Sequence, residues 1–189
     1  MSAPVTAEQL VALAAEWDVT RAGWEAQQTL PLDADAFLTR ASWYDRNRGP
    51  LLLFDVYYRR LLAGAVLATV LPHVWTAAEW PSAAMPVPAW LALFRAAGFC
   101  SDSAGMERPS ALLTVYRGTT PGRRRGMAWT TDADKAEWFA ARWRLAGRQD
   151  AAVYLASIEP RAVLALIDCR GEAEVVVDPD LLPRPISRQ

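Results

Sequence analysis

The sequence predicts an α+β protein, in which an N-terminal helical layer packs on a small split antiparallel β core. Up to about residue 109, apolar residues recur at helical spacing. After that point the apolar runs are short, rich in β-branched residues and separated by turn residues. Helices followed by strands is an order typical of α+β proteins. We therefore expect a helical region over residues 1–109, integrated with a β core over residues 110–189.

The composition is that of a globular protein with one unusual feature. The 189 residues are 52% hydrophobic and 22% charged, which is enough for one buried core. A net charge of −1 argues against a general polyanion binder. Two cysteines and one histidine cannot make a four-ligand Cys/His metal site. A carboxylate site stays open, but no loop has the calcium-binding pattern, and no metal is predicted. The unusual feature is the nine tryptophans.

The first half of the chain is punctuated like a series of helices. Thr6 to Gln9 form a capping box, and apolar residues follow at helical spacing as far as Trp17. Asp33 is expected to cap the next helix, which Gly49-Pro50 ends. Further helices are expected over residues 50–71, 76–80 and 86–97, the last stopped by Gly98, with a loop over residues 101–109.

The most apolar stretch of the chain is interpreted as a buried helix. Leu51 to Leu71 contains Asp55, Arg59 and Arg60, and three charges within about 20 residues are costly in lipid. The start of the sequence has neither a basic segment nor an apolar segment of the secretory kind. We therefore expect no membrane partner and a cytoplasmic location, which is compatible with delivery by a phage or a secretion system.

The second half predicts strands around a single helix. Thr131 or Asp132 is expected to cap an amphipathic helix whose apolar face carries Ala136, Ala140 and Trp143. Trp138 is assigned to an apolar helix face as well. The expected strands cover residues 112–116, 127–130, 152–158, 163–167 and 174–177.

Three short segments of the second half are similar to the motifs of the ADP-ribosyltransferase fold of the Arg-Ser-Glu class. Val115-Tyr-Arg-Gly118 places an arginine at the end of a short strand. Met127 to Asp132 looks like the Ser-Thr-Ser strand of that class, and Gly171 to Val177 looks like its Glu-x-Glu turn and last strand. The chain also resembles small bacterial and phage-encoded proteins of this type, in which a tryptophan-rich helical region precedes the Tyr-Arg-Gly strand.

The second segment departs from the family pattern. The first serine of the family, which supports the catalytic glutamate, falls on Ala128 in one alignment and on Trp129 in the other. Thr130 or Thr131 then has to supply the hydroxyl.

The resemblance implies cleavage of the nicotinamide–ribose bond of NAD and transfer of ADP-ribose. Glu174 would stabilise the oxocarbenium-like transition state, as a carboxylate does in glycoside hydrolysis. Glu172 lies two residues earlier, on the same side of an extended chain, and implies an arginine acceptor. Without the resemblance, the same two residues fit a solvated turn before an edge strand.

The resemblance also implies a cofactor-binding set. Arg117 would bind the diphosphate of NAD through its planar guanidinium. Trp129 is either a core residue or a platform for nicotinamide, and Thr130 and Thr131 complete the set. The sequence contains no Gly-x-Gly-x-x-Gly motif, so a Rossmann site for NAD is not expected.

Several residues outside these motifs have less specific interpretations. Arg123 to Arg125 form either a solvated loop or a contact for phosphates, an acidic target or nucleic acid. His73 is interpreted as a structural residue of a helix-end turn. Trp75, Trp80 and Trp90 flank helix ends that prolines mark.

Three hypotheses about function remain open from the sequence. The first is an NAD-dependent mono-ADP-ribosyltransferase with a protein arginine, or nucleic acid, as the acceptor. The second is an NAD glycohydrolase toxin that transfers ADP-ribose to water. The third is a catalytically silent fold that serves as a binding module, for instance in a phage particle or in complex with an inhibitor or antitoxin.

Overall fold

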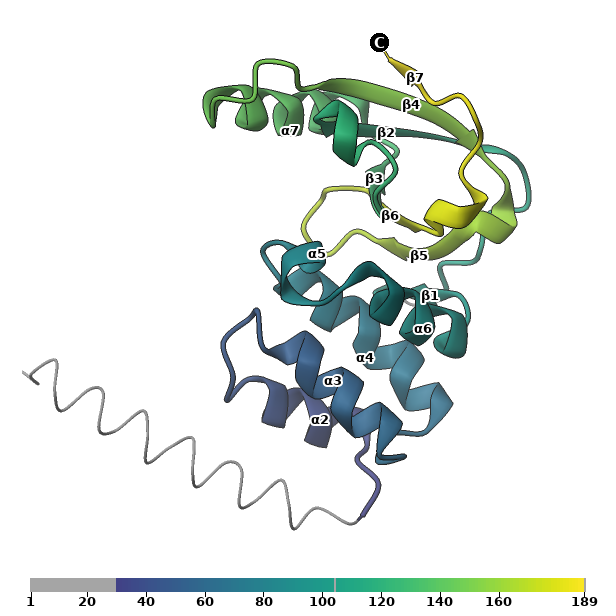
Figure 1. Cartoon of the computed structure of the whole chain (residues 1–189). Coiled ribbons are helices and arrows are strands. Elements are labelled where there is room, and N and C mark those ends of the chain that lie inside the picture. The colour runs from purple at the N-terminus through teal and green to yellow at the C-terminus, as the bar shows by residue number, and fades with distance from the viewer. Residues whose placement is uncertain (1–29, 104, 189) are drawn as a thin grey trace, which may run out of the picture. The chain divides into compact units, whose positions relative to one another are not determined.

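The computed structural model describes residues 30–103 and 105–188. The expected capping box at Thr6 to Gln9 and Trp17 lie outside the described residues. Contacts divide the chain into residues 1–31 and residues 32–189, and the fold below is that of the second unit. Within it, helices are followed by a seven-stranded, mostly antiparallel sheet, which confirms the α+β class (Figure 1).

Five helices come first in the second unit. Their bounds are α2 Ala34–Ala41, α3 Gly49–Tyr58, α4 Gly64–Ala77, α5 Pro81–Ala84 and α6 Val87–Ala97. Asp33 caps α2 as expected, because its carboxylate accepts a hydrogen bond of 2.8 Å from the backbone of Ala36. Gly98 ends α6 with a φ of 78°, a conformation that favours glycine.

The prediction of a single helix over residues 50–71 is wrong. The structure has two helices there, α3 and α4, and α4 ends later than predicted. Arg60 has a φ of 59°, so the chain turns between α3 and α4 and Leu62 pairs with Leu32. Arg59 and Arg60 mark this break, but apolar residues resume at Leu61, so the pair was interpreted as two charges within one buried helix. At the other end α4 continues past Pro72 to Ala77, so the helix predicted over residues 76–80 does not form.

The strands and the last helix follow the predicted order. Their bounds are β1 Cys100–Ser101, β2 Leu113–Thr119, β3 Ala128–Thr130, α7 Ala133–Leu145, β4 Ala152–Ile158, β5 Val163–Ile167, β6 Glu174–Val177 and β7 Ser187–Arg188, with single 3₁₀ turns η1 Pro121–Arg123, η2 Pro160–Ala162 and η3 Pro179–Leu181. β1 and β7 were not predicted, because two residues carry no periodic signal. β1 also shortens the loop predicted over residues 101–109, and β2 extends three residues past the predicted Tyr116. Asp132 caps α7, accepting from the backbone of Asp134 and Lys135.

All seven strands belong to one sheet in the order β1-β5-β6-β3-β2-β4-β7. Only the β1–β5 pair is parallel, so the sheet is mixed rather than purely antiparallel. β2 and β4 pair along seven residues, whereas β2 and β3 pair at Tyr116 and Thr130 alone. The sheet is therefore continuous but narrowest between β2 and β3.

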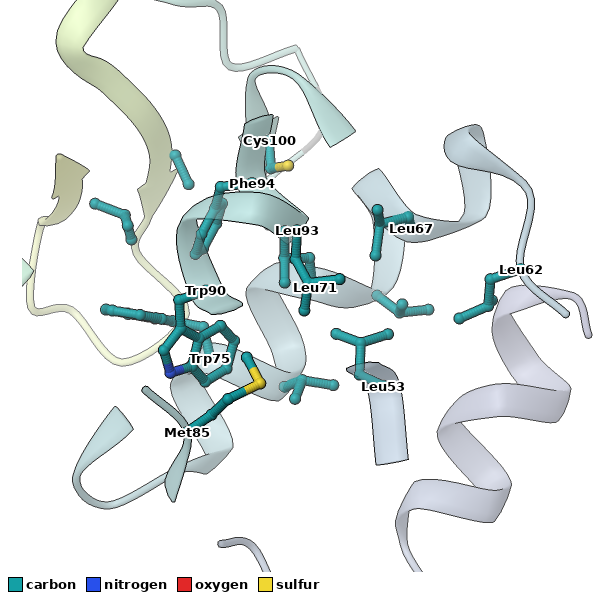
Figure 2. Packing of buried hydrophobic residues seen from close by; sticks show 14 of the residues in the cluster. Leu53, Leu62, Leu67, Leu71, Trp75, Met85, Trp90, Leu93, Phe94 and Cys100 are labelled. Atoms are coloured by element: carbon teal, nitrogen blue, oxygen red, sulfur yellow. The ribbon is translucent and has the colours of Figure 1, made fainter. Parts of the chain in front are cut away.

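One apolar core is shared by the helices and the strands. Trp75 and Trp90 meet edge to face at a centroid distance of 4.9 Å, and Phe94 packs on Trp75 at 5.5 Å (Figure 2). Leu164 and Val176 of β5 and β6 belong to the same cluster. Helices α4 and α6 thus share their buried surface with strands β5 and β6.

Helix α7 lies along β2 and β4 because Gly118 lets it approach (Figure 1). A Cβ at residue 118 would overlap the carbonyl oxygen of Ala136 and lie 2.5 Å from the backbone nitrogen of Ala140. Ala136 and Ala140 are fully buried at this contact. Trp138, in contrast, is 53% exposed, so its expected place on an apolar helix face is wrong.

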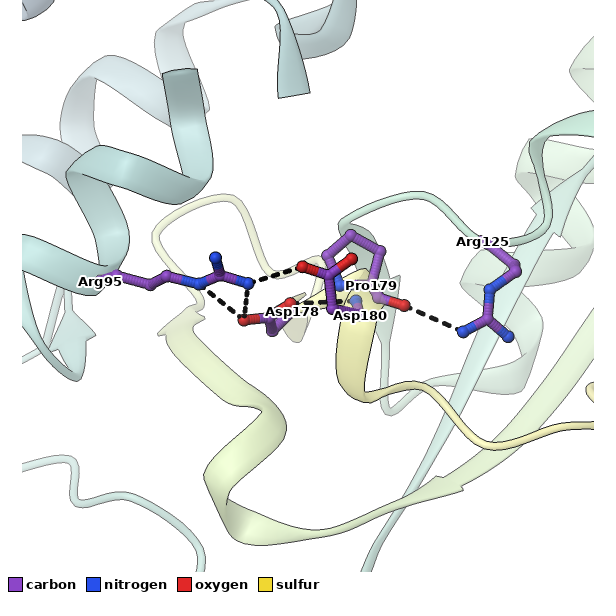
Figure 3. Close-up of polar contacts among 5 residues, drawn as sticks. All are labelled: Arg95, Arg125, Asp178, Pro179 and Asp180. Carbon is purple, nitrogen blue, oxygen red and sulfur yellow. Dashed lines mark hydrogen bonds and ion pairs between the residues drawn. The ribbon is translucent and has the colours of Figure 1, made fainter. Parts of the chain in front are cut away.

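Ion pairs and arginine hydrogen bonds fix the segment after β6. Arg95 of α6 binds Asp178 and Asp180, each at 2.8 Å (Figure 3). Arg125 donates to the carbonyl oxygens of Pro179 and Pro183 at 2.9 and 3.0 Å. Arg125 therefore serves as an internal tether and is not part of a solvated loop.

Candidate functional site

A cavity of about 590 Å³ lies where the three motif segments meet. Its lining comes from the C-terminal half of α4, the segment after it, the strands β2 and β3, the loop between them, α7 and the turn before β6. Arg117, Glu172 and Glu174 are all among the lining residues. The structure thus brings together the charged residues that the sequence singled out.

The order of the strands explains this convergence. β3 lies between β2 and β6, and Thr130 is in register with Tyr116 on one side and Glu174 on the other. Arg117 follows Tyr116 directly. Segments more than 50 residues apart in the sequence are therefore neighbours across two strand pairings.

Glu174 is the first residue of β6, and its carboxylate is held by a helix. The indole nitrogen of Trp75 in α4 donates a hydrogen bond of 2.8 Å to Glu174 Oε1. Burial raises the pKa of Glu174 to about 7, and the charge of Glu172 adds to the rise. The hydrogen bond from Trp75 and the charges of Arg117 and Arg170 oppose it. A carboxylate poised near neutral pH in a cavity is typical of functional sites.

Glu172 lies in the turn before the strand and not in an extended chain. Gly171 and Ala173 on either side of it have φ values of 61° and 45°. Ala173 is not a glycine, so this conformation carries strain. Glu172 nevertheless lines the same cavity as Glu174, and its charge acts on the Glu174 carboxylate. Both residues therefore line one cavity, but strand alternation, on which the prediction rested, is not the reason, because the backbone at Ala173 between them is left-handed.

The turn is held by a residue that the sequence did not reveal. The Asp102 carboxylate accepts hydrogen bonds from the backbone of Asp168 at 3.0 Å and of Cys169 at 2.7 Å. Partial burial opposes the charged form of Asp102, but the hydrogen bonds from Cys169 and Asp168 outweigh it and lower its pKa. Asp102 stands in a polar segment of the sequence, and no local pattern distinguishes it from its neighbours.

The side chain of Arg117 is fixed by hydrogen bonds to the backbone of the loop between β2 and β3 and to that of β3. Its Nη1 donates to the carbonyl oxygen of Ala128, and its Nε donates to that of Arg123 at 3.1 Å. Burial lowers the pKa of Arg117 to about 10, an effect that Glu174 opposes and Arg123 reinforces. Arg117 thus remains cationic at neutral pH. A Cβ at Gly126 would lie 2.7 Å from its Cζ, so glycine leaves the room that the guanidinium occupies.

The remaining residues of the predicted cofactor set have different environments. Trp129 is 2% exposed, and its indole donates to the carbonyl oxygen of Gly126 at 2.8 Å. Thr130 lines the cavity and donates from Oγ1 to the carbonyl oxygen of Glu172 at 2.8 Å. Thr131 is exposed and is not among the lining residues, but its backbone nitrogen donates to Ala173 at 3.1 Å. Both threonines therefore donate hydrogen bonds to the turn at Glu172 and Ala173 that precedes β6.

The sequence missed the group that supports Glu174. The interpretation of Trp75 as a residue near a helix end agrees with its place in the last turn of α4, but its hydrogen bond to Glu174, 99 positions away in the sequence, was not predicted. His73 also lies inside α4, not in a helix-end turn, and is exposed. Cys100 and Cys169 are free, so they form no disulfide. Among the described residues, no cluster of three or more side chains has the composition of a metal site.

The comparisons with known proteins add no assignment. No protein family, curated protein or solved structure matches the chain. No helix within the described residues is long and apolar enough to cross a membrane. The case for a function therefore depends on the geometry of the site.

Proposed function

We propose that this chain is an NAD-dependent mono-ADP-ribosyltransferase. The observation that carries the proposal is the carboxylate of Glu174, which shares one cavity with Arg117 and Glu172. The motif resemblance requires these three residues to act on one substrate. They come from strands β2 and β6 and from the turn before β6, on both sides of β3.

Each residue has a separate part in the proposed reaction. Arg117 binds the diphosphate of NAD, because its fork of N–H donors matches phosphate oxygens. Glu174, when ionised, stabilises the positive charge that develops on the ribose as the bond to nicotinamide breaks. The electrons of that bond return to the ring nitrogen, which is cationic in NAD, so no strong acid is needed.

Glu172 serves the acceptor. An acceptor N–H or O–H attacks the ribose carbon and passes its proton to the Glu172 carboxylate. The resemblance implies arginine as this acceptor, since a carboxylate can orient a guanidinium through two hydrogen bonds. With water in the same place, the products would be those of an NAD glycohydrolase.

Trp75 compensates for the missing serine of the family pattern. The hydroxyl of Thr130 is engaged with the backbone of Glu172, so it does not support the Glu174 carboxylate. The indole N–H of Trp75 makes the supporting hydrogen bond from another element. Every buried carboxylate needs a hydrogen-bond donor, so this contact supports an active site only together with Arg117 and Glu172 in the lining of the same cavity.

The test is turnover of NAD labelled in its adenylate half, offered with proteins, free arginine derivatives and oligonucleotides. We expect wild type to release nicotinamide and Glu174→Gln to lose activity by about 10²-fold or more, as removal of one stabilising group does. Glu159→Gln, an exposed glutamate paired with Arg161, is the matched control and should be as active as wild type. No release of nicotinamide by wild type, or equal release by Glu174→Gln, would overturn the proposal. Failure to bind NAD in calorimetry would favour the silent binding module.

A further inference from the structure

Five residues of the cavity lining form a separate group that the proposed chemistry does not use. We call them the tryptophan–arginine rim: Trp80, Trp138, Trp143, Arg123 and Arg142. They come from the segment after α4, from α7 and from the loop between β2 and β3.

The rim residues stack on one another. The Arg142 guanidinium carbon lies 5.0 Å from the ring centroid of Trp138 and 5.8 Å from that of Trp80. Arg123 lies 5.1 Å from the ring of Trp143, and the rings of Trp80 and Trp143 are 5.5 Å apart. The rim is therefore one connected series of contacts, in which each of the two arginines lies over at least one indole ring and two of the indoles lie next to each other.

The rim is exposed although its tryptophans are large and apolar. Trp80 is 43% exposed and Trp138 is 53% exposed. Helix α7 packs on the sheet through Ala136 and Ala140, so Trp138 is not needed for that contact. Exposed apolar surface bordered by polar groups is typical of a binding site.

The charge of the cavity indicates an anionic ligand. Its lining includes three glutamates, Glu79, Glu172 and Glu174, and twice as many arginines: Arg46, Arg117, Arg123, Arg125, Arg142 and Arg170. The whole chain, in contrast, has a net charge of −1. Four of these arginines have other partners: Arg46 pairs with Glu79, Arg125 donates to backbone carbonyl oxygens, the charge of Arg170 acts on Glu174, and Arg117 is assigned to the diphosphate of NAD. The two rim arginines are left for another anion.

We propose that the rim binds single-stranded nucleic acid, and that a base of this strand is the acceptor of ADP-ribose. Unpaired bases stack on exposed indole rings, and arginines beside them neutralise the phosphates. A duplex keeps its base faces stacked inside the helix, so it lacks this mode of binding. The rim cations repel the guanidinium of a protein arginine, which makes arginine the less suitable occupant.

The second half of this proposal rests on the proposed function. A ring or amino N–H of the base attacks the ribose carbon, nicotinamide leaves with the electron pair of its bond, and Glu172 takes the proton. Binding to the rim, in contrast, needs no NAD. The two claims are therefore separable by experiment.

The binding test uses the full chain without NAD and fluorescence anisotropy of labelled 12-nucleotide single strands of DNA and RNA. We expect Trp138→Ala and Arg142→Gln each to weaken binding by about tenfold, the effect of one lost base stack or charged contact. Trp43→Ala and Arg161→Gln remove exposed residues of the same types outside the cavity lining and should bind as wild type does. Absence of binding, equal binding of the duplex, or equal losses in all four variants would overturn the rim proposal.

The transfer test adds labelled NAD to the same oligonucleotides beside an arginine-rich protein. We expect label on the single strand, and about 10²-fold slower labelling when Glu174→Gln is used, although that variant still binds the strand. Label on protein arginines alone would overturn the acceptor proposal. Release of nicotinamide without binding of the strand would refute the rim and leave the proposed function standing. Binding of the strand without release of nicotinamide would refute the proposed function and leave the rim proposal standing.

Discussion

The proposed chemistry depends on the carboxylate of Glu174. Its ionisation predicts how kcat/KM changes with pH. Only the ionised form can stabilise a developing cation, and the pKa is about 7. We expect kcat/KM for nicotinamide release to rise about tenfold per pH unit below pH 7 and to level off above it. Glu172→Gln removes a charge that raises this pKa, so the transition should move to lower pH. A flat profile between pH 5.5 and 8 would contradict this assignment.

Trp75 is a positioning residue, and a pH profile separates that role from packing. Trp75→Phe removes the hydrogen bond that favours ionised Glu174, so we expect the rise in kcat/KM to move to higher pH. The cost in stability should be about 1–2 kcal/mol, from the lost hydrogen bond and the smaller ring.

Trp90→Phe is the matched control for Trp75→Phe. Trp90 packs on Trp75 in the same cluster, and its indole donates to the carbonyl oxygen of Pro81 at 2.8 Å. The control should cost similar stability and leave the pH profile in place. If the pH profile of kcat/KM shifted equally in both variants, Trp75 would be a packing residue of the core and not a positioning residue.

At the scale of elements, the contact of α7 with β2 sets the wall of the cavity. Gly118→Ala would place a methyl group against the backbone of Ala136 and Ala140, and the helix has to move. We expect a loss of about 2–4 kcal/mol in the free energy of unfolding, measured in urea. Gly122→Ala is the control, since nothing lies within 4 Å of a Cβ there and its backbone is unstrained. A Gly118→Ala protein as stable as wild type would show that α7 is not seated as described.

The elements also show what a sequence can predict. Strand β6 and helix α7 were predicted because a short run of β-branched residues and an Asp cap are local signals. The break between α3 and α4 was missed, since the sequence does not show that Arg60 is left-handed and apolar residues stand on both sides of the Arg59–Arg60 pair. The Trp75–Glu174 contact was missed for another reason: it joins distant residues, and only the assembled fold defines it.

At the scale of the whole molecule, the helical region completes both the core and the site. Leu164 and Val176 of the sheet are buried in the cluster that holds Trp75 and Trp90. We therefore expect residues 110–189 alone to lack cooperative unfolding in urea, because this face of the sheet would be open to water. The full chain is the reference. A cooperative transition of the fragment would show that the β core is an independent domain.

The central claim is that Arg117, Glu172 and Glu174 act together on NAD. The most direct measurement is a crystal structure of the Glu174→Gln variant soaked with NAD, in which slow turnover preserves the substrate. We expect the diphosphate on Arg117 and the nicotinamide-bearing ribose between residues 172 and 174. NAD bound away from these three positions, or no NAD at saturating concentration, would contradict the account.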